Sequence, residues 1–360
     1  MSTRHYIHPV EQTEWKVKGS DAETIFTWDY DDGRDKLLSL YEKGKDKQWN
    51  ASHRIDWSHE IDHDNPLLAP EHAIPIFGSP MYDKMTEKEK ANLRRNMTAW
   101  QFSQFLHGEQ GALICTAKIV QTCPDLDSKF YAATQVIDEA RHVEIYARYL
   151  NEKVKMFYPI NHHLKSLLDD VVVDSRWDIT NLGMQIIIEG LALAAFGMVR
   201  DLSGDPLAKS LTAYVMQDEA RHVAFGRLAL RDYYPQLSDG ERAQREEFVV
   251  DACYLMRDRF LAHEVWEQLG LDTKECIKYV ESSESMKEFR KMLFSRIVPT
   301  IKDIGLWGPK VRKAFEDMGI IAFQDVDVEQ LGAYDEQVGD AFDLERKSVI
   351  RDVVAIGAAE

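Results

Sequence analysis

The strongest constraint on the fold is a hexapeptide, DEARHV, that occurs twice in the chain. One copy is Asp138–Val143 and the other is Asp218–Val223, so the second begins 80 residues after the first. In each copy a glutamate and a histidine are three positions apart, which places both side chains on the same face of an α-helix. A single pair of this kind is common on protein surfaces, but two identical hexapeptides indicate a repeated structural role.

A further glutamate precedes each copy at the same distance. Glu109 lies 30 residues before Glu139, and Glu189 lies 30 residues before Glu219. Glu189 stands in the middle of a nearly continuous apolar stretch, residues 183–199, which is typical of a helix buried on every side. An ionised carboxylate there is costly unless it is paired or bound to a metal. The pattern therefore predicts one buried site with six ligands: Glu109, Glu139, His142, Glu189, Glu219 and His222.

The charges of these six side chains match two divalent cations. Four carboxylates carry four negative charges and two neutral imidazoles add none, so two divalent ions balance the cluster. Mixed carboxylate and imidazole ligands favour iron or manganese. A structural zinc site would instead use cysteine, and a zinc protease would carry HExxH.

The residues beside the two hexapeptide glutamates are expected to orient the ligands. Asp138 and Asp218 each precede a ligand glutamate, and each is well placed to accept the free imidazole N–H of the histidine on the opposite helix. Arg141 and Arg221 lie in the same two segments, and we expect them to complete this outer layer of contacts.

Long helical patterns make up the middle of the chain. The first opens with Thr86 and Glu89 in the arrangement of a capping box, and a long connection with one short helix separates the second pattern from the third. No credible run of alternating strands is present. The layout predicts an all-α fold, a ferritin-like four-helix bundle with one long crossover and extra N- and C-terminal helices. The four helices are expected at residues 86–120, 128–153, 178–201 and 207–234.

Composition divides the chain into three expected parts. Residues 1–85 are rich in His, Asp, Trp and Pro and predict an N-terminal arm with one helix, near residues 31–49. Residues 86–235 form the metal-binding bundle. Residues 236–360 are expected to supply C-terminal helices packed on the bundle, followed by an acidic tail.

The net charge and the cysteines limit the partners and the compartment. A net charge of −17 argues against nucleic acid or an anionic membrane as a partner, because both need a basic surface. The four cysteines lack CxxC spacing, as is typical of reduced thiols, and the N-terminus has no apolar core for a secretory signal. The apolar stretch around Glu189 is too short for a membrane span and carries a charge at its centre. We therefore expect a cytoplasmic protein without a membrane span.

Over residues 86–234 the sequence resembles the ferritin-like non-haem di-iron carboxylate superfamily. The resemblance implies that the six predicted ligands bind two iron ions, with Mn/Fe as the alternative to Fe/Fe, and that the reduced site uses O2 as a co-substrate. HGEQGAL and DEARH are similar to segments of bacterial multicomponent monooxygenase hydroxylase subunits, which carry a threonine where this chain has Leu193. Aminoarene N-oxygenases share the overall pattern but add a histidine ligand at the position of Val215, a difference that argues against membership.

Tyr146 is a candidate catalytic or redox residue. It stands four residues after His142, where the similar small subunits of ribonucleotide reductase carry a radical tyrosine. Ligand-binding oxidases of the small-subunit type are similar as well. Ordinary core packing is the alternative for a single aromatic side chain on a helix.

An apolar substrate pocket is expected beside the metals. Aromatic and aliphatic side chains surround Glu109 and Glu189 in the sequence, and pockets of this kind are lined mainly by such residues. The candidate lining residues are Phe105, Leu106, Leu113, Ile186 and Leu193.

Together these features predict a monooxygenase-type di-iron oxygenase or oxidase that hydroxylates, desaturates or N-oxygenates a small organic substrate. A ferroxidase or iron-handling protein and a radical-generating subunit are the alternatives, although the chain is much longer than an iron-storing bundle requires. The sequence contains no reductase module, so electrons are expected from a separate donor such as a reductase or ferredoxin. We also consider that two copies of the chain form a homodimer.

Overall fold

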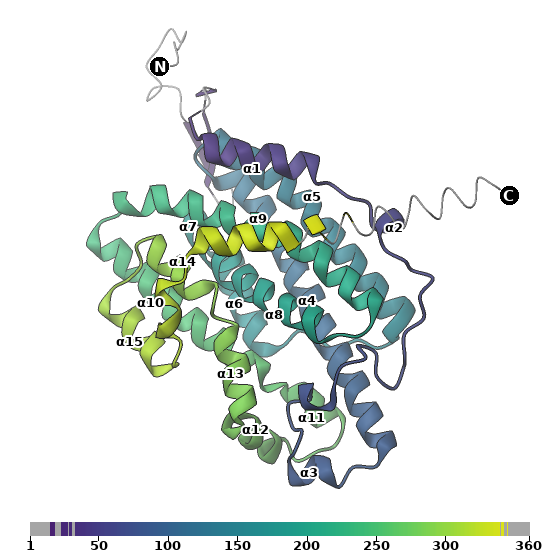
Figure 1. Ribbon diagram of the computed structural model, residues 1–360. Helices are drawn as coiled ribbons and strands as arrows, with labels where there is room; N and C mark the ends of the chain where they lie inside the picture. The colour runs from purple at the N-terminus through teal and green to yellow at the C-terminus, as the bar shows by residue number, and fades with distance from the viewer. Residues whose placement is uncertain are drawn as a thin grey trace, which may run out of the picture.

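The computed structural model describes residues 15–18, 23–27, 29–30, 33–338, 340–341 and 344. Four long helical segments lie side by side within these residues (Figure 1). α4 packs against α5, α8 packs against α9, and α5 also contacts α9. The predicted all-α, ferritin-like bundle is confirmed, and its helices are α4 (Glu87–Thr122), α5 (Leu126–Arg148), α8 (Glu189–Leu202) and α9 (Pro206–Tyr233).

The helices of the bundle begin at residues that satisfy their free backbone N–H groups. Thr86 and Glu89 form the predicted capping box: the Glu89 N–H donates to Thr86 Oγ1 at 3.3 Å, and the Thr86 N–H donates to Glu89 Oε2 at 2.7 Å. At the start of α9, Asp205 accepts the N–H of Ala208 at 2.8 Å, and Pro206 occupies the first turn. Such caps fix where each helix starts, and hence which side chains face the interior.

The third helix of the bundle is not a regular α-helix. It begins as α7 (Trp177–Asn181), continues as a π-helical segment, η4 (Leu182–Ile188), and becomes α8 at Glu189. A π-helical segment changes the direction of all following side chains and is frequent at functional sites. The sequence predicted a continuous α-helix here, because an apolar run without polar positions carries no information about helical phase.

This third helix is also the one helix among the described residues that is long and apolar enough to span a membrane, at Trp177–Leu202. Of its most apolar window, 78% is buried inside the protein. The helix therefore has the burial expected of a core element.

The connection between the second and third helices is the expected long crossover. It starts with the π-helical segment η3 (Tyr149–Val154) and contains one short helix, α6 (His162–Val173). α6 packs on α4 and on α10 (Asp239–Asp258). The crossover thus joins the bundle to the C-terminal helices.

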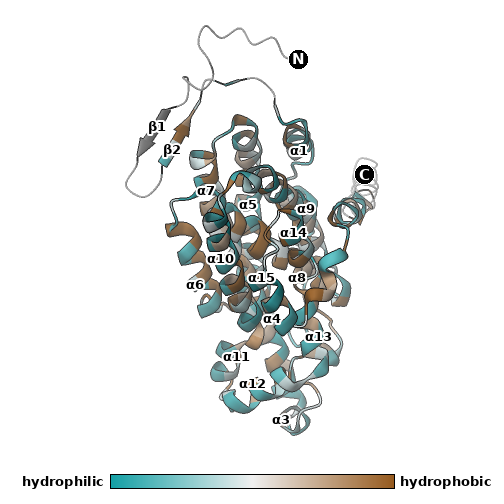
Figure 2. Cartoon of the chain, turned by 90° about the vertical axis from the view of Figure 1, so that its left-hand side faces the viewer, coloured by the Kyte–Doolittle hydropathy of each residue, from teal (hydrophilic) through white to brown (hydrophobic). Residues whose placement is uncertain are grey.

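The N-terminal part contains a small sheet that the sequence did not predict. β1 (Trp15–Lys18) and β2 (Glu23–Phe26) pair antiparallel, with Trp15 opposite Phe26. The hairpin stands at one end of the bundle (Figure 2), and four residues per strand are too few to produce a readable alternation. α1 (Asp35–Asp46) lies on α5 and α9, and three short segments follow it: α2 (Ala51–Arg54), η2 (Glu71–Ala73) and α3 (Pro80–Asp83).

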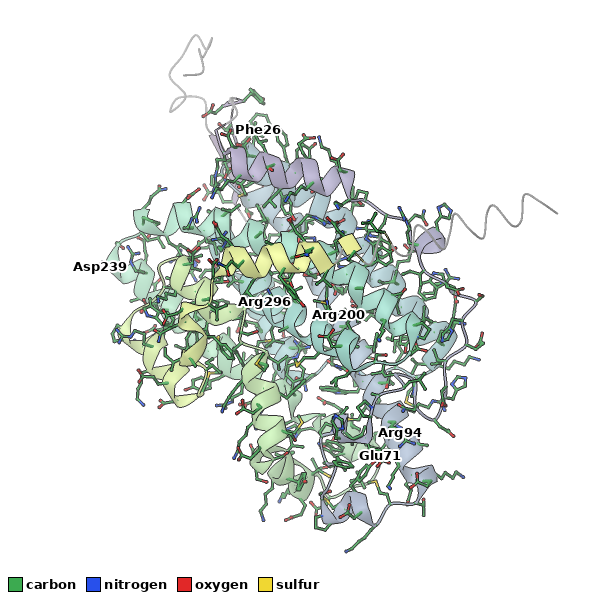
Figure 3. All side chains as sticks on the ribbon, in the orientation of Figure 1. Phe26, Glu71, Arg94, Arg200, Asp239 and Arg296 are labelled. Atoms are coloured by element: carbon green, nitrogen blue, oxygen red, sulfur yellow. The ribbon has the colours of Figure 1, made fainter. Side chains whose placement is uncertain are left out.

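Residues after the bundle form short helices against one side of it. A last described helix, residues 328–338, crosses the view in yellow in Figure 1 and is held by an ion pair between Asp335 and Arg296, at 2.6 Å. Arg296 is labelled in Figure 3. The features expected for residues 1–14 and 345–360, including the acidic tail, lie outside the described residues. The elements are η5 (Tyr234–Gln236), α10, η6 (Arg259–Leu261), α11 (His263–Gln268), α12 (Thr273–Ser282), α13 (Glu284–Met292), α14 (Ile297–Asp303), α15 (Pro309–Asp317) and η7 (Ile321–Asp325).

Candidate metal centre

Each helix of the bundle brings at least one carboxylate to the same point in the core. α4 contributes one glutamate, α8 begins with another, and α5 and α9 each contribute a glutamate and a histidine. Each of these residues is at most 5% exposed. The structure thus brings all six predicted ligand residues together: Glu109, Glu139, His142, Glu189, Glu219 and His222.

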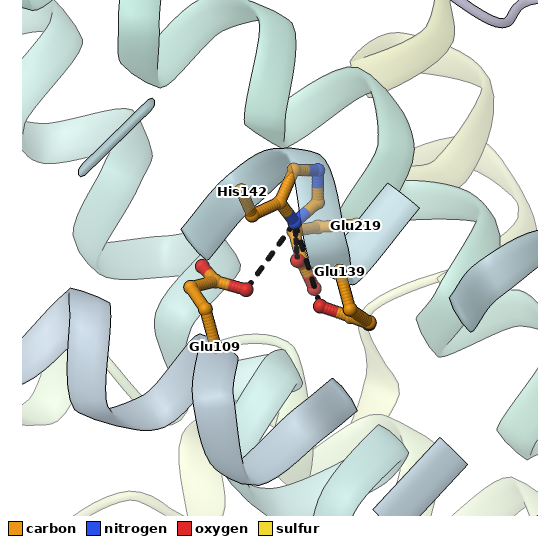
Figure 4. A group of neighbouring side chains, drawn as sticks. All are labelled: Glu109, Glu139, His142 and Glu219. Carbon is orange, nitrogen blue, oxygen red and sulfur yellow. Dashed lines mark hydrogen bonds and ion pairs between the residues drawn. The ribbon is translucent and has the colours of Figure 1, made fainter. Parts of the chain in front are cut away.

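The six residues form two overlapping groups. Ligand atoms of Glu109, Glu139, His142 and Glu219 lie within 4.8 Å of one another, and so do those of Glu139, Glu189 and His222. Figure 4 shows the first group converging on Nδ1 of His142. Because Glu139 belongs to both groups, the arrangement fits two neighbouring metal ions that share a carboxylate.

The two histidines are oriented so that Nδ1 faces the carboxylates. Nδ1 of His142 lies 3.2 Å from Oε2 of Glu109, and Nδ1 of His222 lies 3.1 Å from Oε1 of Glu139. The other ring nitrogen, Nε2, contacts an aspartate of the opposite helix: Asp218 for His142, at 3.1 Å, and Asp138 for His222, at 3.2 Å. An aspartate that accepts the Nε2 proton leaves the Nδ1 lone pair free for a metal.

Two arginines neutralise the aspartates. Arg141 donates to Asp138 at 2.5 Å and to Asp218 at 2.8 Å, so it links the two helices. Arg221 pairs with Asp218. The Arg221 guanidinium helps to hold the pKa of Asp218 well below its usual range, although burial opposes ionisation. Asp218 is therefore charged, which strengthens its hydrogen bond with the Nε2–H group of His142.

The arm of the chain adds two contacts to this layer that sequence reasoning missed. The indole N–H of Trp49 donates to Oδ2 of Asp218 at 2.9 Å, and Nε2 of Gln48 donates to Oδ1 of Asp138 at 2.7 Å. Nothing in the sequence around Gln48 and Trp49 signals these contacts, because the partners are 90 and 169 residues away in the chain.

Gln135 is a third residue that the sequence did not single out. Its Nε2 donates to Oε1 of Glu139 at 2.9 Å and to Oε1 of Glu189 at 3.0 Å. It lies four positions before Glu139 on α5, and hence on the ligand face of that helix. This spacing could have suggested Gln135, but a buried glutamine is common in helix bundles.

The protonation of the cluster reflects its burial. Burial, with the charge of Glu219, raises the pKa of Glu109 and of Glu189 well above the usual range. Burial opposes the charge on His142, but the charge of Glu109 and the hydrogen bonds with Asp218, Glu109 and Glu139 together raise the pKa of that imidazole. Without metal, protons on the cluster therefore lower its negative charge. Divalent ions would displace these protons.

Several carboxylate oxygens of the cluster have no hydrogen-bond donor within the described chain. They are Oε2 of Glu139, Oε2 of Glu189 and both oxygens of Glu219. Buried polar atoms without partners are rare in native proteins unless an ion or water satisfies them. These free oxygens, directed into a cluster of hard ligands, fit two divalent iron or manganese ions.

A small cavity lies beside the carboxylates, between α4 and α8. Its volume, counted as space open to the centres of water molecules, is about 20 Å³, enough for one or two waters. Phe105, a candidate pocket residue, is one of its lining residues. The whole lining is Gln104, Phe105, Gly108, Glu109, Ala112, Ile188, Glu189, Leu191, Ala192, Ala195, Phe196, Glu219, Arg259 and Phe260.

The other four predicted pocket residues do not line this cavity. Leu106 and Leu113 are half-buried on α4, and Ile186 is buried in the π-helical segment. Leu193 lines a different hollow, against residues 328–336. Leu106, Leu113, Ile186 and Leu193 thus lie away from this cavity, and their role in binding a substrate stays a prediction.

Helical phase explains why these four side chains lie away from the cavity. At about 100° per residue, Leu106 and Leu113 project to one side of Glu109, whereas Phe105 and Ala112 project to the other side, where the cavity is. On α8 the same rotation separates Leu193 from Ala192 and Phe196. The sequence identified the glutamates but gave no sign of which flank of each helix faced the open space.

Tyr146 lies close to the cluster in an aromatic environment. It is fully buried and packs against Phe102, Phe105 and Phe196, with ring centroids 5.8 to 6.0 Å apart. Its hydroxyl has no hydrogen-bond partner among the described residues, and burial raises its pKa well above the usual value. These surroundings suit either a redox residue or a packing residue.

A family model described as P-aminobenzoate N-oxygenase AurF matches residues 31–305. Among solved structures, an aldehyde deformylating oxidase from Synechococcus is similar at 16% identity and a TM-score of 0.47, covering 62% of this chain and 96% of that one. A mutant of an R2-like ligand-binding oxidase with a reconstituted Mn/Fe cofactor is similar at 17% identity and a TM-score of 0.46, covering 78% of this chain and 96% of that one. No curated protein matches the chain.

The family match corrects one expectation from the sequence. Val215 stands where the resemblance placed a seventh histidine ligand, and this difference argued against membership of the N-oxygenase family. Val215 is fully buried on α9, and the match extends across it. Since the match covers residues 31–305, well over half of the chain, the protein belongs to the P-aminobenzoate N-oxygenase AurF family and is an O2-dependent di-iron oxidoreductase.

Proposed function

We propose that this chain is a cytoplasmic N-oxygenase that transfers an oxygen atom from O2 to the nitrogen of a small aromatic amine. The observation that carries the proposal is the buried cluster of four carboxylates and two imidazoles, which lies within the matched residues 31–305. The name of the family supports nitrogen as the oxidised atom. Hydroxylation or desaturation at carbon uses the same kind of site and is the alternative outcome of the test.

We propose that all six residues of the cluster are metal ligands. Glu109 and His142 would hold one ion, Glu189 and His222 the other, and Glu139 lies in both groups. Glu219 approaches both imidazoles, at 3.2 and 3.5 Å. Fe/Fe is the pair that we favour and Mn/Fe the alternative, because carboxylate-rich sites accept both metals.

The two ions would supply O2 activation, and the protein supplies the conditions for it. Conversion of an amine to a hydroxylamine consumes one O2, two electrons and two protons and releases one water. Asp138 and Asp218 hold the Nε2 protons of the two histidines, so that Nδ1 can bind metal. The apolar wall around Phe105 and Phe196 excludes bulk water from the reacting atoms.

We further propose that the two flanking parts of the chain, residues 1–85 and 236–360, serve the bundle. Trp49 from the arm contacts Asp218, and Arg259 and Phe260 from the C-terminal part line the cavity. The two electrons would come from a separate donor protein such as a reductase or ferredoxin. A homodimer is a further proposal, and the molar mass in solution from light scattering would decide it.

The test is single turnover with labelled oxygen. The iron-loaded chain is reduced without air, mixed with 4-aminobenzoate and ¹⁸O2, and the products are analysed by mass spectrometry. One ¹⁸O atom on nitrogen supports the proposal, and ¹⁸O on carbon, or an alkene product, contradicts N-oxygenation. Iron oxidation that continues far beyond two ions per chain would identify a ferroxidase instead.

Metal analysis and a tyrosine variant complete the test. His222→Ala should lower bound iron well below two ions per chain, and full retention would contradict the ligand assignment. Tyr146→Phe should leave product formation intact if Tyr146 only packs. A persistent tyrosyl radical signal that disappears in Tyr146→Phe would favour a radical-generating subunit.

A further inference from the structure

One side of the bundle is exposed in the described chain but carries almost no charge. On α4, between residues 106 and 121, the exposed positions are three or four apart and form one ridge. On α5, between residues 129 and 147, they form a second ridge in the same way. The exposed positions are Gln110, Ile114, Ala117, Gln121, Phe130, Ala133, Ile137, Ala140 and Glu144. Because α4 and α5 pack against each other, the two ridges form one surface, the α4/α5 face.

Large apolar side chains of the α4/α5 face point into solvent. Ile137 is 57% exposed, Ile114 is 50% exposed and Phe130 is 40% exposed. Soluble monomers rarely expose a continuous apolar patch of more than a few hundred Å², and larger patches mark interaction surfaces. The α4/α5 face therefore has the character of a surface that another protein covers.

The composition of the chain makes this face more unusual. The net charge is −17, and carboxylates are frequent on other exposed helices. The exposed positions of α10, for example, include Asp239, Glu241, Glu247 and Asp251. Among the exposed positions of the α4/α5 face, Glu144 is the one charged residue. Depletion of charge is typical of the central part of a protein–protein interface.

The area between the two ridges is apolar as well. Nζ of Lys129 donates to the carbonyl oxygen of Val120 at 2.9 Å, so this flank of α5 faces α4. Val136 and Val143 follow Lys129 at intervals of seven residues, which places them on the same flank. Leu113 and Val120 are half-buried at the same interval on α4. The two ridges are thus joined by aliphatic side chains, and the apolar surface is continuous.

The α4/α5 face lies on helices that carry metal ligands, but away from the cavity. Ile137 lies two residues before Glu139, and Gln110 directly follows Glu109. No residue of the face lines the small cavity beside the carboxylates. A partner on this face would support two ligand-bearing helices and leave the cavity between α4 and α8 uncovered.

We propose that a second copy of this chain packs on the α4/α5 face, related by a two-fold axis near Ile137. A two-fold contact requires a surface that is complementary to itself, and an apolar face with almost no charge meets this condition. Other acidic surfaces of two copies repel each other. A different protein would be selected through complementary charge, for which this face offers one carboxylate. The inference rests on the homodimer proposed above and names its interface.

The charges at the two ends of α5 fit this arrangement. Lys129 lies eight residues before Ile137, and Glu144 lies seven residues after it. When two copies of α5 cross nearly antiparallel at Ile137, Glu144 of each copy lies opposite the partner's Lys129. Opposite charges at the edge of an interface select one relative orientation of the two copies.

The α4/α5 face is also large enough for a stable dimer. Residues 129–147 of α5 span about 27 Å at about 1.5 Å per residue, and two neighbouring helices are about 20 Å wide. The flat area is thus roughly 540 Å² per copy, or roughly 1,100 Å² for two copies. A specific interface needs about 1,000 Å² in total. The face reaches this area without the neighbouring loops.

The first experiment measures the mass in solution of the full chain loaded with Fe(II) under argon. Sedimentation equilibrium should give twice the chain mass of 41.5 kDa, with a Kd of about 1 µM or tighter. Ile137→Arg should weaken dimerisation at least about 1,000-fold, because each copy then places an unpaired charge at the centre of the contact. A monomeric wild type, or a dimer that persists in Ile137→Arg, would overturn the proposal.

Controls separate the interface from the fold. Met292→Arg changes an apolar side chain that is 48% exposed on α13, outside the α4/α5 face, and should leave the dimer intact. Ile137→Arg should keep the helical circular dichroism spectrum and two iron ions. If it loses either, Ala133→Arg provides the decisive measurement, because Ala133 lies one turn away on the same ridge. Dissociation by Met292→Arg, or an intact dimer of Ala133→Arg, would contradict the assignment.

A cysteine variant tests the position of the two-fold axis. All four native cysteines are buried, so Ile137→Cys adds an accessible thiol. A residue beside a two-fold axis lies close to its own copy, and mild oxidation should therefore link two chains of Ile137→Cys by a disulfide. Met292→Cys should not form this link. A thiol at position 137 that reacts rapidly with a maleimide but forms no link is uncovered, and one that reacts with neither is covered by the chain itself; both results overturn the proposal.

The results also distinguish this inference from the proposed function. A wild-type dimer that persists in both arginine variants would leave the homodimer standing and refute the α4/α5 face. A monomeric wild type would refute both. The ¹⁸O product analysis decides N-oxygenation separately, because no residue of the face lines the cavity.

Discussion

Replacing Glu189 by methionine separates the stability of the fold from its capacity to bind metal. In the metal-free chain Glu189 is a nearly fully buried carboxyl group in an apolar helix, and only one of its oxygens is hydrogen-bonded. Burial raises its pKa well above the usual range. Glu189→Met should therefore stabilise the metal-free chain, or leave its stability unchanged, while it destroys part of the metal site.

The magnitude follows from the contacts of Glu189. Removing the buried carboxylate oxygen that has no hydrogen-bond partner stabilises the folded chain by about 1–3 kcal/mol. Losing the hydrogen bond from Gln135 destabilises it by about 1 kcal/mol. Gln135 keeps its second acceptor, Glu139. The net effect is a stabilisation of about 0–2 kcal/mol. An unfolding entropy of about 2.1 cal/mol/K per residue gives roughly 0.76 kcal/mol/K for 360 residues. The expected rise in melting temperature is thus about 0–3 °C.

With metal bound, the wild type should melt at a higher temperature than Glu189→Met. A ligand at 100 times its Kd stabilises the folded state by about 2.7 kcal/mol, which corresponds to roughly 3.5 °C here. The wild type should gain this increment with Fe(II) under argon, and Glu189→Met should not. Melting curves from tryptophan fluorescence, with and without metal, would measure both effects, and metal analysis of the same samples would count the bound ions.

Glu246 offers a matched control, since it is also a buried glutamate but has a structural partner. It accepts the backbone N–H of Gly308 at 2.8 Å, and α10 positions it outside the metal cluster. Glu246→Met should lower the melting temperature and leave metal binding intact. The reasoning is refuted if Glu189→Met destabilises the metal-free chain as Glu246→Met does, or if it keeps two metal ions.

Two further predictions concern the cysteines and helix packing. Burial raises the pKa of the Cys115 and Cys123 thiols to about 12, so neither should react with a thiol reagent at pH 8 until the chain unfolds; labelling of the native protein would contradict this. Gly226→Ala should cost about 1–3 kcal/mol in urea unfolding, because its new Cβ would lie 2.5 Å from that of Gln185, whereas Gly240→Ala, with open space around it, should cost far less.

The six residues of the cluster could be predicted because chain order and helical period together define them. The glutamate and histidine of each hexapeptide share a helix face, and the preceding glutamates repeat at the same spacing. Charge balance then requires the four helices to meet. The outer contacts of Asp138 and Asp218 with the histidines could be predicted for the same reason. The contact of Trp49 with Asp218 could not be predicted, because the two residues are 169 positions apart and no local sequence pattern indicates it.

The pocket was harder to predict than the ligands because it depends on which flank of each helix is left open. Leu193 and Leu191 are equally apolar, but only Leu191 faces the cavity. The π-helical segment Leu182–Ile188 adds a second difficulty, since it shifts the phase just before Glu189. Hydrophobicity reports that a residue is buried, and it does not distinguish a packed wall from an open one.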